Sequence, residues 1–172
     1  MIKKILKRSF QVLLVAFIVI QFFRPGKNTA SGPEAFAKDI TTVHTVPADV
    51  QVILKKACND CHSNNTEYPW YNYIQPVAWW LNNDIRDGKK EINFSEFAGY
   101  SLRRQYFKLE KINGEVKEGG MPLPAYTWIH RNAKLNETEK LAIDNWTTAI
   151  RDSMKAVYPP DSLARKNPAP AK

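Results

Sequence analysis

The segment KKACNDCHSN, residues 55–64, contains the only two cysteines of the 172-residue chain, and a histidine follows the second one directly. Cys58 and Cys61 lie three positions apart, so one turn of helix brings both thiols to the same side. Four kinds of thiol site have this spacing: a structural disulfide, a thioredoxin-like redox pair, half of a zinc site and the attachment point of a covalent haem. The surrounding segments discriminate among these four.

Residues 1–24, MIKKILKRSFQVLLVAFIVIQFFR, combine a basic start without acidic residues and an almost uninterrupted apolar run. This pattern is typical of an export signal or a membrane anchor. The run is short for a full span, which favours a cleaved signal, but no well-placed pair of small residues follows it as a cleavage site. We predict that residues 1–26 anchor the chain to the inner membrane, with the remainder on its periplasmic side; a soluble periplasmic product is the alternative.

The net charge of +8 is carried by the two ends of the chain. Residues 1–27 contain six Lys and Arg and no acidic residue, and residues 151–172 contain five basic and two acidic residues. The stretch 28–150 has 14 basic and 15 acidic residues. A nucleic-acid-binding domain needs a basic face on its folded part, so the sequence excludes nucleic acid as a partner.

Helical patterns dominate the middle of the chain, and no alternating apolar run indicates a strand. Proline at a first turn and two capping-box spacings mark the helix starts, while glycines mark the ends. The predicted helices run from Pro47 into Cys58, from Val77 to Asp87 with Gly88 after it, from Asn93 to Glu118 before Gly119, and from Asn136 past Met154. The segment MPLPAYTWIH, with two prolines, is predicted to be non-helical.

These patterns divide the chain into four parts. The anchor is followed by a small, polar linker at 27–45 and by one all-α domain at 46–157. The remainder, 158–172, is rich in proline and is predicted to be a disordered tail that buries nothing.

The four alternatives for the thiols need different surroundings. A zinc site requires about four ligands, and beyond the cysteines the chain offers only His44, His62 and His130. A thioredoxin-like pair lies between a strand and a helix, and no strand is predicted. In an exported chain, C-x-x-C-H is typical of covalent haem attachment, in which both thiols add to the haem and the histidine ligates the iron. We predict haem on Cys58 and Cys61, with zinc, a redox pair and a plain disulfide as the minor alternatives.

Met121 is the predicted ligand on the opposite side of the iron. It lies in EGGMPLPAY, residues 118–126, where two glycines permit close approach of the backbone and two prolines stiffen the loop. Met154 falls on the apolar stripe of the last helix, where methionine usually fills core space. His130 and His44 are rival ligands, and a Met121 that merely packs is the remaining alternative.

Large aromatic side chains are frequent for a domain of this size. A haem is a broad apolar plate that must be shielded from water, and flat rings pack on it well. Trp79 and Trp80 are adjacent, so only one of them faces a given side of a helix. We predict that Trp79 forms part of the haem pocket wall, ordinary packing being the alternative.

Three segments carry a resemblance to known proteins: ACNDCHSNNTEYPWYNYIQPVAWWLNNDI (57–85), NFSEF (93–97) and EGGMPLPAYTWIH (118–130). Together with the closing LNETEKLAIDNW helix they look like a class I cytochrome c. More narrowly, the chain over 45–155 resembles a bacterial haem-binding domain family of small, membrane-associated c-type proteins. The resemblance implies a cytochrome c-like helical fold around one covalently attached haem c.

The resemblance also implies roles for single residues. Cys58 and Cys61 would carry the haem, His62 would be the proximal ligand and Met121 the distal one. In cytochromes c a proline carbonyl often accepts the hydrogen bond of the proximal histidine. The expected counterpart here is Pro76, with Pro69 in its place as the alternative.

Two functions are expected on this basis. The first is a membrane-tethered electron carrier, not an enzyme, whose His/Met-ligated haem exchanges single electrons with redox partner proteins. The second is a haem sensor or peroxidase-like protein with an open or displaceable sixth position. Peroxidase chemistry needs a distal histidine or arginine, which His130 and Arg131 would have to supply.

Overall fold

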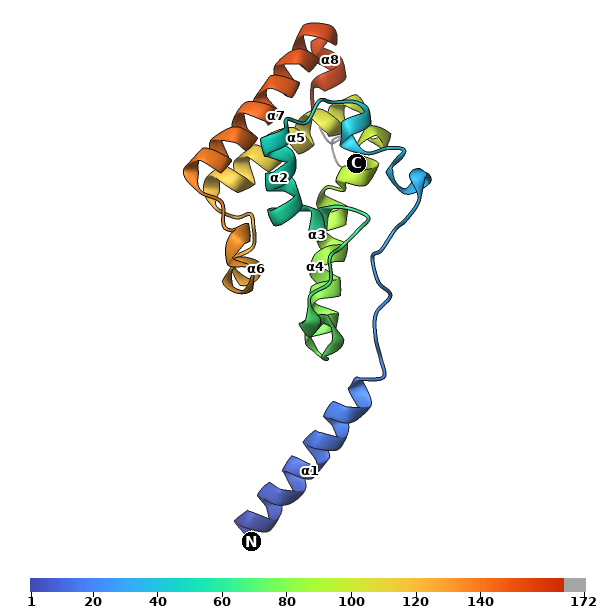
Figure 1. Ribbon diagram of the computed structural model, residues 1–172, viewed down its shortest axis with the longest axis vertical. Coiled ribbons are helices and arrows are strands. Elements are labelled where there is room, and N and C mark those ends of the chain that lie inside the picture. Colours follow the sequence, from blue (N-terminus) through green and yellow to red (C-terminus); the bar gives the residue numbers. More distant parts are fainter. Residues whose placement is uncertain (166–172) are drawn as a thin grey trace, which may run out of the picture.

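The computed structural model describes residues 1–165, which form helices joined by short loops (Figure 1). Within these residues one antiparallel bridge, between Thr29 and Asn65, is the only extended pairing. The all-α prediction is therefore confirmed. The α-helices are α1 (Ile2–Ile20), α2 (Ala48–Ala57), α3 (Asn59–His62), α4 (Val77–Glu91), α5 (Leu102–Glu118), α6 (Pro124–Ile129), α7 (Glu137–Val157) and α8 (Pro160–Leu163). The 3₁₀ helices are η1 (Pro33–Phe36), η2 (Ile40–Thr42), η3 (Trp70–Tyr73), η4 (Phe94–Gly99) and η5 (Arg131–Ala133).

The core lies where α5 and α7 pack along each other and α2 packs against α7 (Figure 1). Each helix contributes a buried apolar stripe at helical spacing, and removing this surface from water is the main stabilising term. A short ion pair of 2.5 Å between Lys56 and Glu139 also joins α2 to α7. The buried stripe of α2 consists of Val50, Ile53, Leu54 and Ala57, and that of α7 includes Ile143, Trp146, Ile150 and Met154.

Two helix ends are formed by the signals that predicted them. At the start of α7 the Asn136 side chain accepts a hydrogen bond from the Glu139 backbone (2.9 Å), and the Glu139 carboxylate accepts one from the Asn136 backbone (3.0 Å). This is the predicted capping box. At the end of α5, Gly119 has a left-handed backbone with φ +78°, which glycine adopts without steric cost.

Three other helix predictions are wrong. α4 continues through Gly88 to Glu91 instead of ending there. Asn93 caps the 3₁₀ helix η4 through a bond from the Ser95 backbone (3.1 Å), and α5 begins separately after Ser101. The segment MPLPAYTWIH contains α6, because Pro124 occupies a first-turn position where its missing N–H is not needed.

The folded domain extends beyond the predicted bounds at both ends. Ile40 is 2% exposed and belongs to the core, and the Asn28 side chain donates to the Ser63 carbonyl (2.8 Å). The segment 27–45 is thus packed and hydrogen-bonded to the domain, not a free linker. Leu163 in α8 is 5% exposed, so the prediction that the tail buries nothing is wrong at this residue. The remainder of the predicted tail, residues 166–172, lies outside the described residues.

The N-terminal helix α1 has no buried residue and extends away from the other helices (Figure 1). Gln21, just after it, exchanges hydrogen bonds with Gln75 at 2.9 and 3.3 Å, and Trp79 Nε1 donates to the Phe23 carbonyl at 2.8 Å. The end of α1 therefore meets the N-terminal end of α4. None of the helices in residues 1–165 has both the length and the apolar character needed to cross a membrane.

Candidate haem site

The C-x-x-C-H motif lies at a bend between two helices. α2 ends at Ala57, Cys58 has a non-helical backbone (φ −127°, ψ −45°), and the short α3 follows. The Cys58 carbonyl then accepts bonds from the backbone N–H groups of Cys61 (3.1 Å) and His62 (2.9 Å). One turn of backbone thus holds both thiols and the imidazole in a fixed relation.

Gly88 brings α4 into direct contact with this turn. A Cβ at position 88 would lie 2.8 Å from the Cys61 carbonyl oxygen and 3.1 Å from the Cys61 Cβ. Side chains do not tolerate the shorter distance, so only glycine permits this approach. From the sequence Gly88 is predicted to be a helix end; a glycine inside a helical pattern is also a known sign of close packing.

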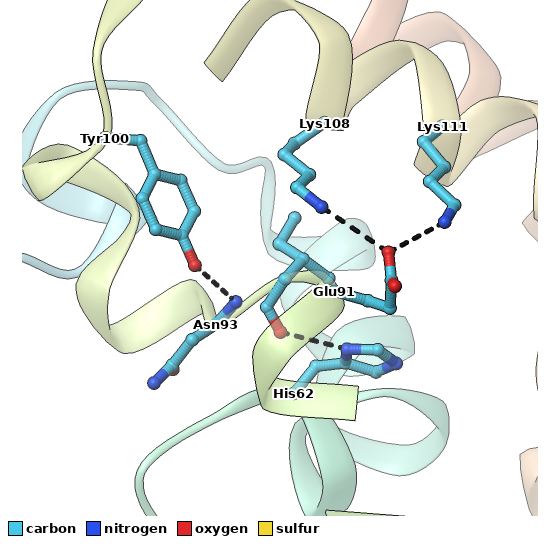
Figure 2. A network of polar contacts seen from close by, with 7 residues as sticks. His62, Glu91, Asn93, Tyr100, Lys108 and Lys111 are labelled. Carbon is cyan, nitrogen blue, oxygen red and sulfur yellow. Dashed lines mark hydrogen bonds and ion pairs between the residues drawn. The ribbon is translucent and has the colours of Figure 1, made fainter. Parts of the chain in front are cut away.

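His62 is oriented by a backbone carbonyl just beyond α4. Its Nδ1 lies 3.0 Å from the Ile92 carbonyl oxygen (Figure 2). Because a carbonyl only accepts, Nδ1 carries the proton and Nε2 keeps its lone pair. Burial lowers the pKa of His62, although the Ile92 and Gly88 carbonyls and Glu91 act in the opposite direction. A neutral imidazole with a free Nε2 is the form that binds iron.

The Ile92 carbonyl takes the role predicted for Pro76, and that prediction is wrong. Pro76 is exposed at the opposite end of α4, where it precedes the first helical residue. Trp79 lies at the same end, is 38% exposed and donates to Phe23. The prediction that Trp79 lines the haem pocket is therefore also wrong.

Met121 is held near the motif from the other side. After the turn at Gly119, the Met121 backbone N–H donates to the Glu115 carbonyl (3.0 Å), which fixes the loop against the end of α5. Tyr126 in α6 donates to Asp60 of α3 at 2.7 Å. Burial, together with this hydrogen bond, raises the pKa of Tyr126, which therefore remains a donor. The half-buried Met121 is thus placed between α5 and α6.

Two adjoining cavities meet at these residues, and both are lined by Cys58, His62 and Met121. The first, of about 100 Å³, is lined by Lys108 and Lys111 as well, and we call it the lysine cavity. The second, of about 230 Å³, is also lined by Cys61 and Gly88 and by four acidic side chains, and we call it the acidic cavity. The structure therefore brings four of the six predicted cofactor-binding side chains, Cys58, Cys61, His62 and Met121, to one place.

The rival iron ligands lie elsewhere. His130 Nε2 is 2.5 Å from the Tyr71 hydroxyl, and its ring stacks on Tyr126 at 4.4 Å. His44 packs edge-on against Phe97 in the core. Met154 is 3% exposed within the core stripe of α7, as predicted. Met121 is thus the better placed candidate for the distal side.

Both cysteines are free thiols, and burial raises the pKa of each to about 12. A redox-active C-x-x-C pair instead has a thiol of lowered pKa, and a disulfide would join the two sulfurs. Within residues 1–165 no group of three His, Cys, Asp or Glu side chains could hold a metal ion, which argues against zinc. Attachment of a haem to the two thiols stays a prediction.

The residues fit that cofactor. The two thiols, an imidazole with a free Nε2 and a thioether line the cavities together with apolar side chains such as Phe94 and Val116, and a haem pocket requires both kinds of group. An all-α fold that places this set around a pocket is that of a haem protein.

The chain belongs to the haem-binding domain family, whose model matches residues 15–149. The chain is also similar to cytochrome c peroxidase Ccp of Escherichia coli (strain K12), at 28% identity over 100 residues. The matched stretch is 56% of this chain and only 22% of that protein. No solved structure matches the chain.

Proposed function

We propose that this haem-binding protein carries one haem c, bound covalently through Cys58 and Cys61, and transfers single electrons between redox partner proteins. The observation that carries the proposal is the convergence of Cys58, His62 and Met121 on the same pair of cavities. The haem would supply a one-electron Fe(III)/Fe(II) couple, in which the iron gains one electron and returns it.

The protein side chains set the conditions for that couple. The bond to the Ile92 carbonyl makes Nε2 of His62 a better donor and prevents the ring from rotating. The thioether of Met121 is a soft ligand that favours reduced iron and so raises the potential. Apolar side chains also line the cavities, Phe94 among them in the lysine cavity, and would shield a bound haem from water.

Covalent attachment is tested on the purified full-length protein. The haem should remain with the polypeptide through boiling, a denaturing gel and acid–acetone extraction. Cys58→Ala should weaken attachment without abolishing it, because Cys61 still provides one thioether. Haem that is extracted completely from the wild-type protein would show that the cofactor is not of the c type.

The distal ligand is tested by Met121→Ala, with Met154→Ala as the matched control. Loss of Met121 should remove the weak charge-transfer band of iron–methionine coordination, allow carbon monoxide to bind the reduced protein and lower the potential. Met154→Ala should leave these properties unchanged and cost about 2–5 kcal/mol of stability, because a buried methionine is lost. An identical spectrum in both variants would contradict ligation by Met121.

A peroxidase-like function is the second candidate, and the similarity to a cytochrome c peroxidase favours it. It requires an open or displaceable sixth position and a side chain that polarises peroxide. His130 stacks on Tyr126, which lines the acidic cavity together with Met121, and is the candidate for that role. Peroxide turnover by the wild-type protein that is lost in His130→Ala would establish this function in place of electron transfer.

We also propose that α1 tethers the protein to the periplasmic face of the inner membrane. The support is the exposure of the apolar side chains of α1, together with the basic residues at its start. Membrane-isolated protein should retain Met1 or Ile2 at its N-terminus. A mature protein that begins after Phe23 and remains soluble would instead identify α1 as a cleaved signal.

A further inference from the structure

The charged side chains around the two cavities are distributed unequally. Among the described residues that line the acidic cavity there is no Lys or Arg. In the lysine cavity, two ammonium groups face two carboxylates. The charged residues of the acidic cavity are Asp60, Asp84, Asp87 and Glu91, and those of the lysine cavity are Glu91, Lys108, Lys111 and Glu115.

Lys108 and Lys111 lie on the cavity-facing stripe of α5. Their Nζ atoms are 3.5 and 2.7 Å from Oε2 of Glu91, and Figure 2 shows both side chains extending from α5 toward Glu91, near the His62 ring. The Lys108 side chain is only 18% exposed. Each ammonium group has three N–H donors, and Glu91 accepts one from each. Both therefore have donors left for a further anionic group.

The two cysteines are placed differently with respect to the cavities. Cys61 lines the acidic cavity but not the lysine cavity, whereas Cys58 lines both. A haem has its two vinyl groups, which form the thioethers, on the edge opposite its two propionate carboxylates. In a haem attached to Cys58 and Cys61 the carboxylate edge would therefore lie away from Cys61. Of the two cavities, the lysine cavity is the one that Cys61 does not line, so this edge would lie nearer to it.

We propose that Lys108 and Lys111 bind the propionate carboxylates of the haem. The inference rests on the proposed covalent attachment, which defines the opposite edge. In the acidic cavity the carboxylates would meet four acidic side chains and no lysine or arginine of the lining, although Asp87 and Glu91 are paired with lysines outside it. Like charges at close range cost free energy. In the lysine cavity they meet two ammonium groups, and hydrogen bonds between ionised partners are the strong ones.

Bound in this way, the propionates and the charged side chains around them would form one cluster of charges that influences the reduction potential of the iron. The titratable groups that line the lysine cavity apart from Cys58, and that would face the propionates, are His62 from α3, Glu91 from α4, and Lys108, Lys111 and Glu115 from α5. The ammonium groups favour the ionised propionates, while Glu91 and Glu115 oppose ionisation. Positive charge near the iron also favours the reduced state, because Fe(II) carries one positive charge less than Fe(III).

The test is the midpoint potential of the full-length holoprotein measured by spectroelectrochemistry across pH. In the double variant K108Q/K111Q the inflection that reports propionate ionisation should move to higher pH, and the potential at neutral pH should fall. Lys117→Gln is the control, because Lys117 is on the same helix but 72% exposed and directed toward Asp144. Its curve should match that of the wild type. A double variant whose curve also matches the wild type overturns the proposal.

Lys111→Gln alone provides an independent test if the double variant does not fold. It removes one of the two ammonium groups of the lysine cavity and leaves Lys108 beside Glu91, so the inflection should move to higher pH by less than in the double variant. An unchanged curve, or movement to lower pH, overturns the proposal. Loss of the haem on a denaturing gel would contradict only the covalent attachment. The curve of midpoint potential against pH can still be recorded in that case, because the native protein would still bind the haem non-covalently.

Discussion

The two ends of α4 differ in almost every respect. Its C-terminal end is closely packed: Gly88 lies against the Cys61 backbone, and the Ile92 carbonyl holds His62. Its N-terminal end is open, with Trp79 38% and Trp80 53% exposed, and it contacts the residues that follow α1. The end of α4 at the candidate haem site thus depends on a glycine and a backbone carbonyl, whereas its aromatic end contacts the segment that follows α1.

Among substitutions in α4, the largest expected effect is that of Gly88→Ala. The new Cβ would lie 2.8 Å from the Cys61 carbonyl oxygen, so α3 and α4 have to move apart. We expect a loss of about 1–3 kcal/mol in the free energy of unfolding, as is typical of overpacking. Urea unfolding measures this loss, and staining for covalent haem should show reduced attachment.

Gly114→Ala is the matched control for this variant. Gly114 also lies inside a helix, α5, but a Cβ at position 114 would have nothing within 4 Å. Alanine should there stabilise the protein by about 0.5–1 kcal/mol, because it is the better helix former. Equal responses of the two glycines would show that the C-terminal end of α4 is not closely packed.

Trp79→Phe should have a smaller effect, confined to the other end. The variant keeps an aromatic ring and loses the N–H bond to Phe23, which is worth about 0.5–1 kcal/mol at a partly exposed site. The haem spectrum and potential should not change. Trp80→Phe is the control and should alter neither stability nor spectrum. A shifted spectrum in Trp79→Phe would restore Trp79 as part of the pocket wall.

The smallest expected effect is that of Asp84→Asn. Asp84 lines the acidic cavity, and burial, aided by the nearby charge of Asp87, raises its pKa. Above that raised pKa the native protein contains an ionised carboxylate that is better solvated in the unfolded chain. Asn should therefore stabilise the protein at about pH 7, by less than about 1 kcal/mol because the group is partly solvated.

The gain from Asp84→Asn should vanish as the pH falls through the carboxyl range. At about pH 3 Asp84 is protonated in both states, so wild type and variant should unfold at the same temperature. Asp152→Asn is the control, because Asp152 is exposed and paired with Lys155 at 2.9 Å. It should give no gain at either pH. A gain from Asp84→Asn that persists in acid would contradict the electrostatic explanation.

The features that could be predicted from the sequence have local signals. The capping box at Asn136 and the left-handed Gly119 each depend on residues within one turn. The cysteine spacing, with His62 after it, likewise places three groups on one backbone turn. Met121 is singled out by its glycine and proline neighbours, and the structure brings it to the same cavities. Its ligation of iron stays a prediction.

The features that could not be predicted depend on contacts between distant segments. A glycine that ends a helix and one that permits close packing look alike in sequence, so the role of Gly88 is not evident from its neighbours. The acceptor for His62 is a backbone carbonyl, which every residue has, and nothing in the side chain of Ile92 indicates it. The abundance of tryptophan indicates a pocket wall, but Trp79 lies where the chain after α1 returns to α4.

The hydrogen bonds between Gln21 and Gln75 place the end of α1 beside the first turn of α4, while the cavities lie beside its last turn. At 1.5 Å per residue, the 15 residues of α4 span about 22 Å. The length of α4 therefore determines how far the cavities lie from the end of α1 along the helix axis. If α1 tethers the protein as proposed, a redox partner bound to the same membrane needs its redox centre at a similar distance from the membrane surface. Removing one turn of α4 would lower that height by about 5 Å without changing a single residue of the lysine cavity.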